Sequence, residues 1–329
     1  MITAEIASAL AAAPGEPFTL DSEFVADFAG KQPDWGYGVL SYVVYKRTYA
    51  RALPAGGNEE YWQTCQRVVN GVFELQRRHI PAETWDPDTA QEQAQEMFRF
   101  MWAFKFLPPG RGLWSMGAPL LMERGNGACV YNCAFRSTKD IDAHFSAPFC
   151  YLLEASAVGI GVGFDTRGEG KVTLVTPKKG PRWRWTWTGP RRVRHVIGDS
   201  REGWSEALRI CLEAYAGRGL MPVFDYSAIR PFGAPIKTFG GTASGPEALR
   251  ELLEVDIPEI LGTPGKRITS GQIVDVMNAI GKCVVAGGAR RSAEIALGRH
   301  DDEEFITLKA DKEKVMKWRW ASNNSINAP

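Results

Sequence analysis

The chain has 329 residues, of which 44% are hydrophobic and 23% charged, a length that suffices for one large or two ordinary globular domains. Its formal net charge of +1 creates no broad field for nucleic acid or a membrane, so any anion has to be bound by a local cluster. No apolar run reaches the length of a membrane span, and the first dozen residues lack the basic start and long apolar core of a signal peptide. The sequence therefore predicts a cytoplasmic protein.

The first part of the chain, residues 1–110, is predicted to be helical. Apolar residues recur at three- and four-residue spacing over 36–52 and 59–79, with Asn58 as a candidate N-cap of the second helix. A third helix is expected over 86–106, before a Pro-Pro-Gly stop.

From residue 111 to residue 329 the pattern changes to that of an α/β fold. Glycines and short apolar runs at 128–135 (ACVYNCAF) and 157–164 (AVGIGVGF) read as strands between amphipathic helices. Asp199 or Ser200 is expected to cap one of these helices.

The stretch 171–197 contains two further predicted strands, VTLVTP and RWRWTWT. Alternation in the second places Trp183, Trp185 and Trp187 on one face. Such a face could stack on single-stranded nucleic acid, but an amphipathic hairpin explains the same pattern. Because the net charge is close to neutral, we favour the hairpin and expect no nucleic-acid partner.

The cysteine pattern argues against a disulfide scaffold and against a metal site. Six cysteines are sparse in a chain of this length, and none forms a C-x-x-C pair. We expect most of them to be buried as small hydrophobic residues. They are Cys65, Cys129, Cys133, Cys150, Cys211 and Cys283.

Cys133 is the first candidate for chemistry, since a thiol in an apolar strand can be held dry and still face a ligand cavity. The other interpretation is inert packing. Cys129 precedes it by four residues, which along a strand corresponds to about 13 Å, too far for a disulfide. The glycines at 159, 161 and 163 form a ribbon against which a flat base or sugar could lie, or a tightly packed strand.

Several polar residues could bind an anion or serve only the structure. Asp199 and Ser200 at a helix start could contact a ribose and an anion, or act only as an N-cap. Arg230 and Lys237 fit phosphate contacts and structural ion pairs equally well. The loop that follows the helix starting at Ser270 combines open backbone with fixed positive charge. Its residues are Gly287, Gly288, Arg290 and Arg291.

Five segments of the chain resemble the adenosylcobalamin-dependent (class II) ribonucleotide reductases in order and spacing, and most of all the monomeric ribonucleoside-triphosphate reductase type. The resemblance runs from about residue 20 to the last residue. It implies a helical N-terminal region (1–110) followed by the first half of a ten-stranded α/β barrel with the effector-site region (111–329). The segments are PDWGYGVLSYVVYKRTYAR, NGACVYNCAF, GDSREGW, GAPIKTFGGTASGP and GKCVVAGGARRSAEIALG.

The resemblance also implies roles for the candidate residues. Cys133 becomes one half of the redox pair that forms a disulfide as the ribose is reduced, and Asn132 with Gly159, Gly161 and Gly163 lines the substrate pocket. A deoxynucleotide effector is expected at a second group of residues. These are Asp199, Ser200, Arg230, Lys237, Gly287, Gly288, Arg290 and Arg291.

Parts of the family's machinery do not occur in this sequence. It contains no N-x-C-x-E motif, which in the family supplies the thiyl cysteine and a glutamate. The second redox cysteine and most of the cobalamin site are implied beyond Pro329. We therefore expect activity only with a complementary C-terminal reductase polypeptide, adenosylcobalamin and a thioredoxin-like dithiol, on ribonucleoside triphosphates. The alternative is a noncatalytic nucleotide-binding or regulatory fragment, and the preference for tri- or diphosphates stays open.

Overall fold

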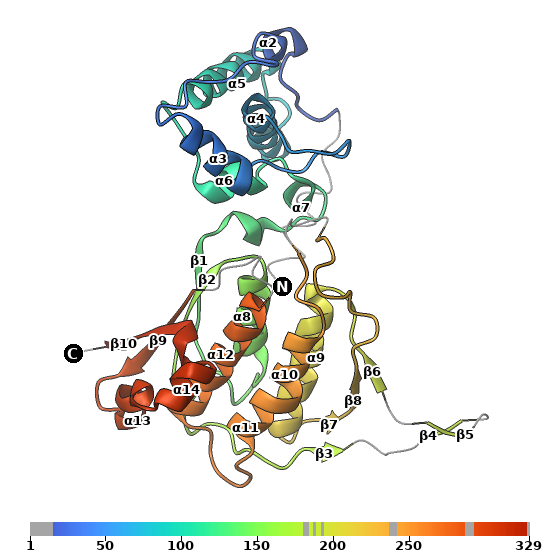
Figure 1. The fold of residues 1–329 in the computed structure, drawn as a ribbon, viewed down its shortest axis with the longest axis vertical. Helices are drawn as coiled ribbons and strands as arrows, with labels where there is room; N and C mark the ends of the chain where they lie inside the picture. The colour runs from blue at the N-terminus through green and yellow to red at the C-terminus, as the bar shows by residue number, and fades with distance from the viewer. Residues whose placement is uncertain are drawn as a thin grey trace. The chain divides into compact units, whose positions relative to one another are not determined.

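The computed structural model describes residues 16–179, 184–186, 189–191, 194–236, 242–286 and 293–327. Within these residues the chain forms two compact units, the first ending at Asn132 and the second beginning at Cys133 (Figure 1). No helix in these ranges is both long and apolar enough to cross a membrane.

The first unit is helical, as predicted from the apolar spacing. α4 and α5 pack against each other and form its centre. α5 starts as its sequence suggests, with Pro87 in the first turn and the Asp86 side chain accepting the Asp88 N–H. The Asn58 cap is wrong: Glu60 is the N-cap of α4 and forms a capping box with Gln63. The elements are α2 (Ser22–Ala26), α3 (Val39–Thr48), α4 (Tyr61–His79), α5 (Pro87–Trp102), α6 (Gly110–Ser115), α7 (Pro119–Met122) and the 3-10 turn η1 (Gly127–Val130).

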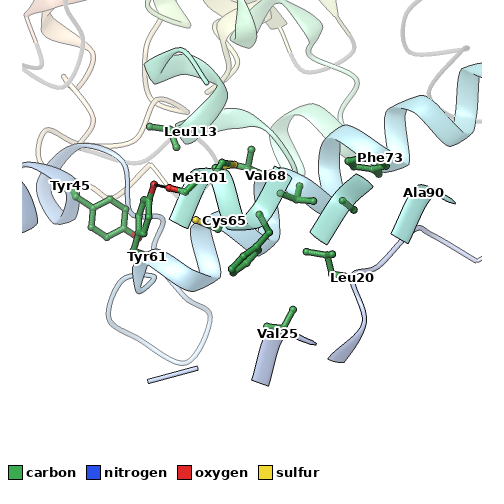
Figure 2. Close-up of a cluster of buried hydrophobic side chains, with 13 residues drawn as sticks. Leu20, Val25, Tyr45, Tyr61, Cys65, Val68, Phe73, Ala90, Met101 and Leu113 are labelled. Carbon is green, nitrogen blue, oxygen red and sulfur yellow. Dashed lines mark hydrogen bonds between the residues drawn. The ribbon is translucent and has the colours of Figure 1, made fainter. Parts of the chain in front are cut away.

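Buried side chains from α4 and α5 make the core of this unit (Figure 2). Cys65 and Val68 of α4 and Phe98 of α5 have no exposed surface. The Tyr61 hydroxyl donates to the Met101 carbonyl at 2.9 Å, so the phenol enters the core with its polar atom satisfied. All buried residues of this core belong to the first unit.

The second unit is built on a four-stranded parallel sheet with the order β1-β2-β9-β10 (Figure 1). This arrangement confirms the predicted α/β class. The strands are β1 (Cys133–Arg136), β2 (Gly161–Asp165), β9 (Glu294–Arg299) and β10 (Ser322–Asn327). The helices and helical turns are α8 (Ala147–Ala157), α9 (Arg201–Tyr215), α10 (Glu247–Glu251), η2 (Leu252–Asp256), α11 (Ile257–Leu261), α12 (Ser270–Val285), α13 (Glu303–Thr307), η3 (Leu308–Ala310), α14 (Lys312–Lys317) and η4 (Arg319–Ala321).

Helices α8 and α12 cover one face of this sheet, and alternate strand residues point toward them. Val162, Phe164 and Ala296 on that face are buried. On the opposite face Phe135 and Ile295 keep 49% and 40% of their surface exposed. The second face is therefore open within the described residues.

Short strand pairs accompany the main sheet. β3 (Lys178–Lys179) pairs with β7 (Leu220–Met221), and β6 (Arg194–Val196) with β8 (Val223–Asp225). β4 (Arg184–Thr186) and β5 (Gly189–Arg191) pair in antiparallel fashion, which agrees with a hairpin in the Trp-Arg stretch, whereas Trp183 and Trp187 lie outside the described residues.

Two strand predictions are wrong. Residues 172–177 form no strand: Thr173 makes an isolated bridge to Arg267, and the N–H groups of Leu174 and Val175 donate to the carbonyls of Lys266 and Tyr215. The predicted strand over 128–135 begins only at Cys133, because Gly127–Val130 turns as a 3-10 helix in the other unit.

Candidate functional site

Cys133 is the first residue of β1 and is exposed on the open face of the sheet. In register it pairs with Gly161 of β2, and Phe135 follows two residues later on the same face. The thiol is therefore accessible rather than dry. Asn132, which precedes it in the chain, is also exposed.

The other cysteines lie in different surroundings. Cys129 is buried in η1 and not on the strand, so the spacing argument along a strand does not apply to it. Burial raises the pKa of the thiols of Cys65, Cys150, Cys211 and Cys283 to about 12, which keeps them protonated and unreactive at neutral pH.

The glycines beside Cys133 leave a strip without side chains. A Cβ on Gly163 would come within 3.0 Å of the Phe135 ring and 3.2 Å of the Ile295 methyl group, so a larger residue here would push these two side chains outward by a few tenths of an ångström. Gly159 has φ +78° in the turn that joins α8 to β2, a conformation that favours glycine. Gly161 itself lies directly opposite Cys133.

Sequence reasoning missed two residues of this face. Ile295 borders the glycine strip, and Asn323 of β10 is paired with it in register and exposed. The period-two alternation in each strand is the signal that could have found them, once the strand order was known. The open face thus combines a thiol, a backbone strip, two apolar side chains and an amide.

The predicted effector residues come together at the start of α9. Ser200 is the N-cap, and its Oγ accepts the Gly203 N–H at 3.0 Å. Arg230 donates from Nε to Asp199 at 2.7 Å, so this arginine does form an ion pair. Both side chains of the pair are about one-third exposed, at 36% for Arg230 and 33% for Asp199, so solvent weakens their attraction.

An open hollow of about 610 Å³ adjoins the segment that carries Arg230. Tyr226 and Phe232 line it with aromatic surface, and the Arg250 guanidinium lies over the Tyr226 ring, 4.6 Å from its centroid. Aromatic surface suits a ligand with a flat ring, while the guanidinium groups of Arg194 and Arg250 in this lining are paired with the carboxylates of Asp225 and Glu247.

The remaining predicted effector residues lie outside the described residues. They are Lys237, Gly287, Gly288, Arg290 and Arg291. The chain on either side of the loop from Gly287 to Arg291 is described. Helix α12 ends before it at Val285, and after it the Ala293 carbonyl accepts the Val162 N–H at 2.9 Å. The segment after the loop is therefore anchored directly to the strand that carries Gly161 and Gly163.

Across the ranges that the structure describes, no group of three or more histidine, cysteine, aspartate or glutamate side chains could hold a metal ion.

Two family profiles match the sequence. Residues 20–118 match "Ribonucleotide reductase alpha domain", and residues 181–261 match "B12-dependent ribonucleotide reductase, insertion domain". An adenosylcobalamin-dependent ribonucleoside-triphosphate reductase of Euglena gracilis is 43% identical over 95% of this chain and 42% of its own length. The enzyme of the same name from Lactobacillus leichmannii is 34% identical over 94% of this chain and 48% of its own.

The fold agrees with these matches. A crystal structure of a B12-dependent (class II) ribonucleotide reductase superimposes with a TM-score of 0.77 and 31% identity, over 94% of this chain and 48% of that one. The chain spans about half the length of the relatives it matches. Its fold and two segments of its sequence thus resemble those of ribonucleotide reductases, a class of oxidoreductases. Within that class the chain is similar to the adenosylcobalamin-dependent, class II enzymes, and it resembles the N-terminal portion of their catalytic chain.

Proposed function

We propose that this chain is the N-terminal part of an adenosylcobalamin-dependent reductase that converts ribonucleoside triphosphates to 2′-deoxyribonucleoside triphosphates. Its parallel sheet would supply the first strands of a ten-stranded barrel, and a complementary C-terminal polypeptide would supply the others. The face of the sheet that is open in the described residues and the half-length match to the relatives support this assignment. The name of those relatives supports a triphosphate substrate.

The observation that carries the proposal is the exposed thiol of Cys133 beside the glycine strip. Reduction at C2′ replaces the hydroxyl by hydrogen and releases water, which consumes two electrons and two protons. Two thiols that join in a disulfide supply both. In the proposed role Cys133 is one of these thiols, the second comes from the remainder of the enzyme, and a thioredoxin-like dithiol restores the pair. Asn132, Gly159, Gly161 and Gly163 would contact the nucleoside.

Adenosylcobalamin, when bound, would supply the radical that starts the reaction. The described residues do not form a site for it. Beside the glycines, the strand residues on the face of Cys133 include Phe135, Asp165, Ile295, Leu297, Asn323 and Ser325. Phe135 and Ile295 remain 49% and 40% exposed, so this face does not enclose a group as large as a corrin. We infer that the complementary polypeptide holds most of the cofactor.

The start of α9 is the proposed site of a deoxynucleotide effector. Asp199 can accept a hydrogen bond from a ribose hydroxyl, and the helix N-terminus favours an anion. Arg230 already lies within 2.7 Å of Asp199 and can turn toward a phosphate, while the neighbouring hollow offers aromatic surface for a base. Lys237 and the loop residues Gly287, Gly288, Arg290 and Arg291 belong to the same proposal.

Reconstitution tests the assignment. The chain is assayed alone and with a C-terminal polypeptide, encoded beside it or taken from the Euglena gracilis relative, in the presence of adenosylcobalamin, a dithiol and each ribonucleotide. We expect deoxynucleotide only from the mixture, and none when Cys133→Ser replaces the wild type. The matched control is Cys211→Ser, which replaces a buried thiol on α9 and should leave the turnover of the mixture at the wild-type level.

Turnover by the chain alone would contradict the need for a second polypeptide. Effector binding without turnover in any mixture would favour the regulatory fragment instead.

A further inference from the structure

Glu294, the first residue of β9, is a carboxyl group buried against helix α12. It is 4% exposed, and its Oε2 accepts one hydrogen bond, from Asn278 Nδ2 at 2.9 Å. Oε1 has no hydrogen-bond partner in the described part of the chain. An ionised carboxylate with a single neutral donor would be very costly at such a site, and burial raises the pKa of Glu294 well above its usual value.

Asn278 links this carboxyl group to the neighbouring strand. Its Oδ1 accepts from the Ser322 hydroxyl at 3.2 Å, and Ser322 is the first residue of β10 and pairs with Glu294 in register. Glu294, Asn278 and Ser322, here named the Glu294 junction, thus join α12 to the amino ends of β9 and β10.

Gly281 lets helix α12 lie close to the Glu294 carboxyl group. A Cβ at this position would lie 1.9 Å from Glu294 Oε1, so any larger residue would displace the carboxyl group.

The charged groups on the elements around the junction have other partners. On α12, Asp275 is paired with Arg319, and Lys282 is paired with Asp256 and Glu251. On β2, Asp165 is held by Thr138, Ser137 and Arg167. Lys309 donates to the Ser322 carbonyl, and Cys283 of α12 is a buried thiol. Among the residues that the structure describes, no cation is directed at Glu294, which agrees with a neutral acid.

The junction lies directly behind the open face of the sheet. Val162, the register partner of Glu294, donates its N–H to the carbonyl of Ala293. The next residue, Ile295, points to the opposite face and borders Gly163 and Phe135. A shift of the amino end of β9 would therefore move Ile295 relative to the strip beside Cys133.

We propose that Glu294 acts as a neutral carboxylic acid that positions the amino end of β9, and through it the substrate-facing residues Ile295 and Gly163. It is a positioning residue, since its own side chain lies on the helix-covered face. Its consequence for catalysis rests on the proposed function, whereas its protonation and its hold on β9 can be measured on this chain alone.

Infrared spectroscopy and pH-dependent unfolding test the neutral acid. We expect the carbonyl band of a protonated carboxylic acid in the wild type at neutral pH and its loss in Glu294→Gln. The folded acid keeps its proton to a higher pH than the unfolded one. Wild-type stability should therefore fall relative to Glu294→Gln as pH rises above about 4.3, the usual glutamate pKa, and continue to fall up to the folded-state pKa.

Glu74→Gln is the matched control, because Glu74 is also 4% exposed but is ionised by its ion pairs with Arg77 and Arg78. At neutral pH, Glu74→Gln should therefore show the same carboxylic acid band as the wild type. If Glu294→Gln also keeps the wild-type carboxylic acid band, and its free energy of unfolding changes with pH in the same way as that of the wild type, Glu294 is ionised and the proposal is wrong.

Hydrogen exchange tests the positioning role. Glu294→Gln retains a group that can accept from Asn278 and should preserve the protection of the Val162 amide. Glu294→Leu has no such group and should lower that protection at least about tenfold beyond its loss in global stability. The positioning role would be overturned if the Val162 amide lost the same protection in both variants. It would also be overturned if the loss in Glu294→Leu equalled the loss in global stability. These readouts do not depend on nucleotide reduction, so failed reconstitution would count only against the proposed function.

Discussion

The buried ion pair between Asp275 of α12 and Arg319 of η4 gives the sharpest stability prediction. Arg319 donates to the Asp275 carboxylate from Nε at 2.6 Å and from Nη2 at 2.8 Å, and Trp318 adds a third hydrogen bond at 2.9 Å. The two side chains of the pair are only 3% and 7% exposed. The pair fixes η4, and with it the start of β10 at Ser322, on α12.

Asp275→Asn keeps the volume of the side chain and removes its charge. The Arg319 guanidinium would then remain buried without a counter-charge, which costs about 3 to 5 kcal/mol. A domain of ordinary stability has about 5 to 15 kcal/mol in total, so this loss should shift the urea midpoint strongly. Because two compact units can unfold separately, circular dichroism should be combined with hydrogen exchange of α12 amides.

Two controls sharpen the test. Glu206→Gln breaks an exposed pair with Arg209 on α9, whose side chains are 46% and 50% exposed, and should hardly move the midpoint because water screens it. The double variant Asp275→Leu with Arg319→Met replaces the pair by apolar groups and should recover much of the loss. If Asp275→Asn costs no more than Glu206→Gln, the buried-charge argument is refuted.

Three further outcomes are expected. A maleimide should label Cys133 at least about tenfold faster than any other cysteine, because it is the exposed one among six in the intact fold; a second thiol that reacts as fast in peptide mass spectrometry would contradict this. Asp199→Ala should weaken deoxynucleotide binding by about 1 to 3 kcal/mol, and calorimetry showing unchanged affinity for every deoxynucleotide would remove the effector assignment. Burial opposes ionisation of Glu74, but hydrogen bonds led by that from Arg77 lower its pKa to about 2. The stabilisation contributed by ionised Glu74 should be complete above about pH 4.3 and decrease toward pH 2, and the acid unfolding of Glu74→Gln should lack this decrease. Parallel stability curves of the wild type and Glu74→Gln would argue against this role of Glu74.

The helices were largely predictable because their signals are local. Pro87 and the Asp86 cap start α5, and Ser200 caps α9, each within one helical turn of the residues concerned. The cap of α4 was missed because Asn58, a commoner type of N-cap residue, lies two residues before Glu60. Glu60 forms the start because it and Gln63 satisfy each other's backbone groups, which Asn58 does not.

The strand boundary at Cys133 was less predictable, because a single polar residue, Asn132, is the only interruption of the apolar run from 128 to 135. Tertiary contacts decide it: the Cys129 N–H bonds to the Asn126 carbonyl within η1, and Ser115 donates to the Cys129 carbonyl from α6. Residues from Cys133 on pair instead with β2 in the other unit. Residues of one short apolar run therefore belong to two different units.

The sequence by itself determined the family resemblance, the α/β class and the choice of Cys133, Asp199, Ser200 and Arg230 as candidates. The tertiary structure decided that Asp199 and Arg230 pair, that Ile295 borders the glycine strip, and that Glu294 is buried. The physical reason is sequence separation: parallel strands pair only across long crossovers, and the Ser322 to Asn278 hydrogen bond joins residues 44 positions apart. Periodicity shows which face a residue occupies, but the strand order determines what lies beside it.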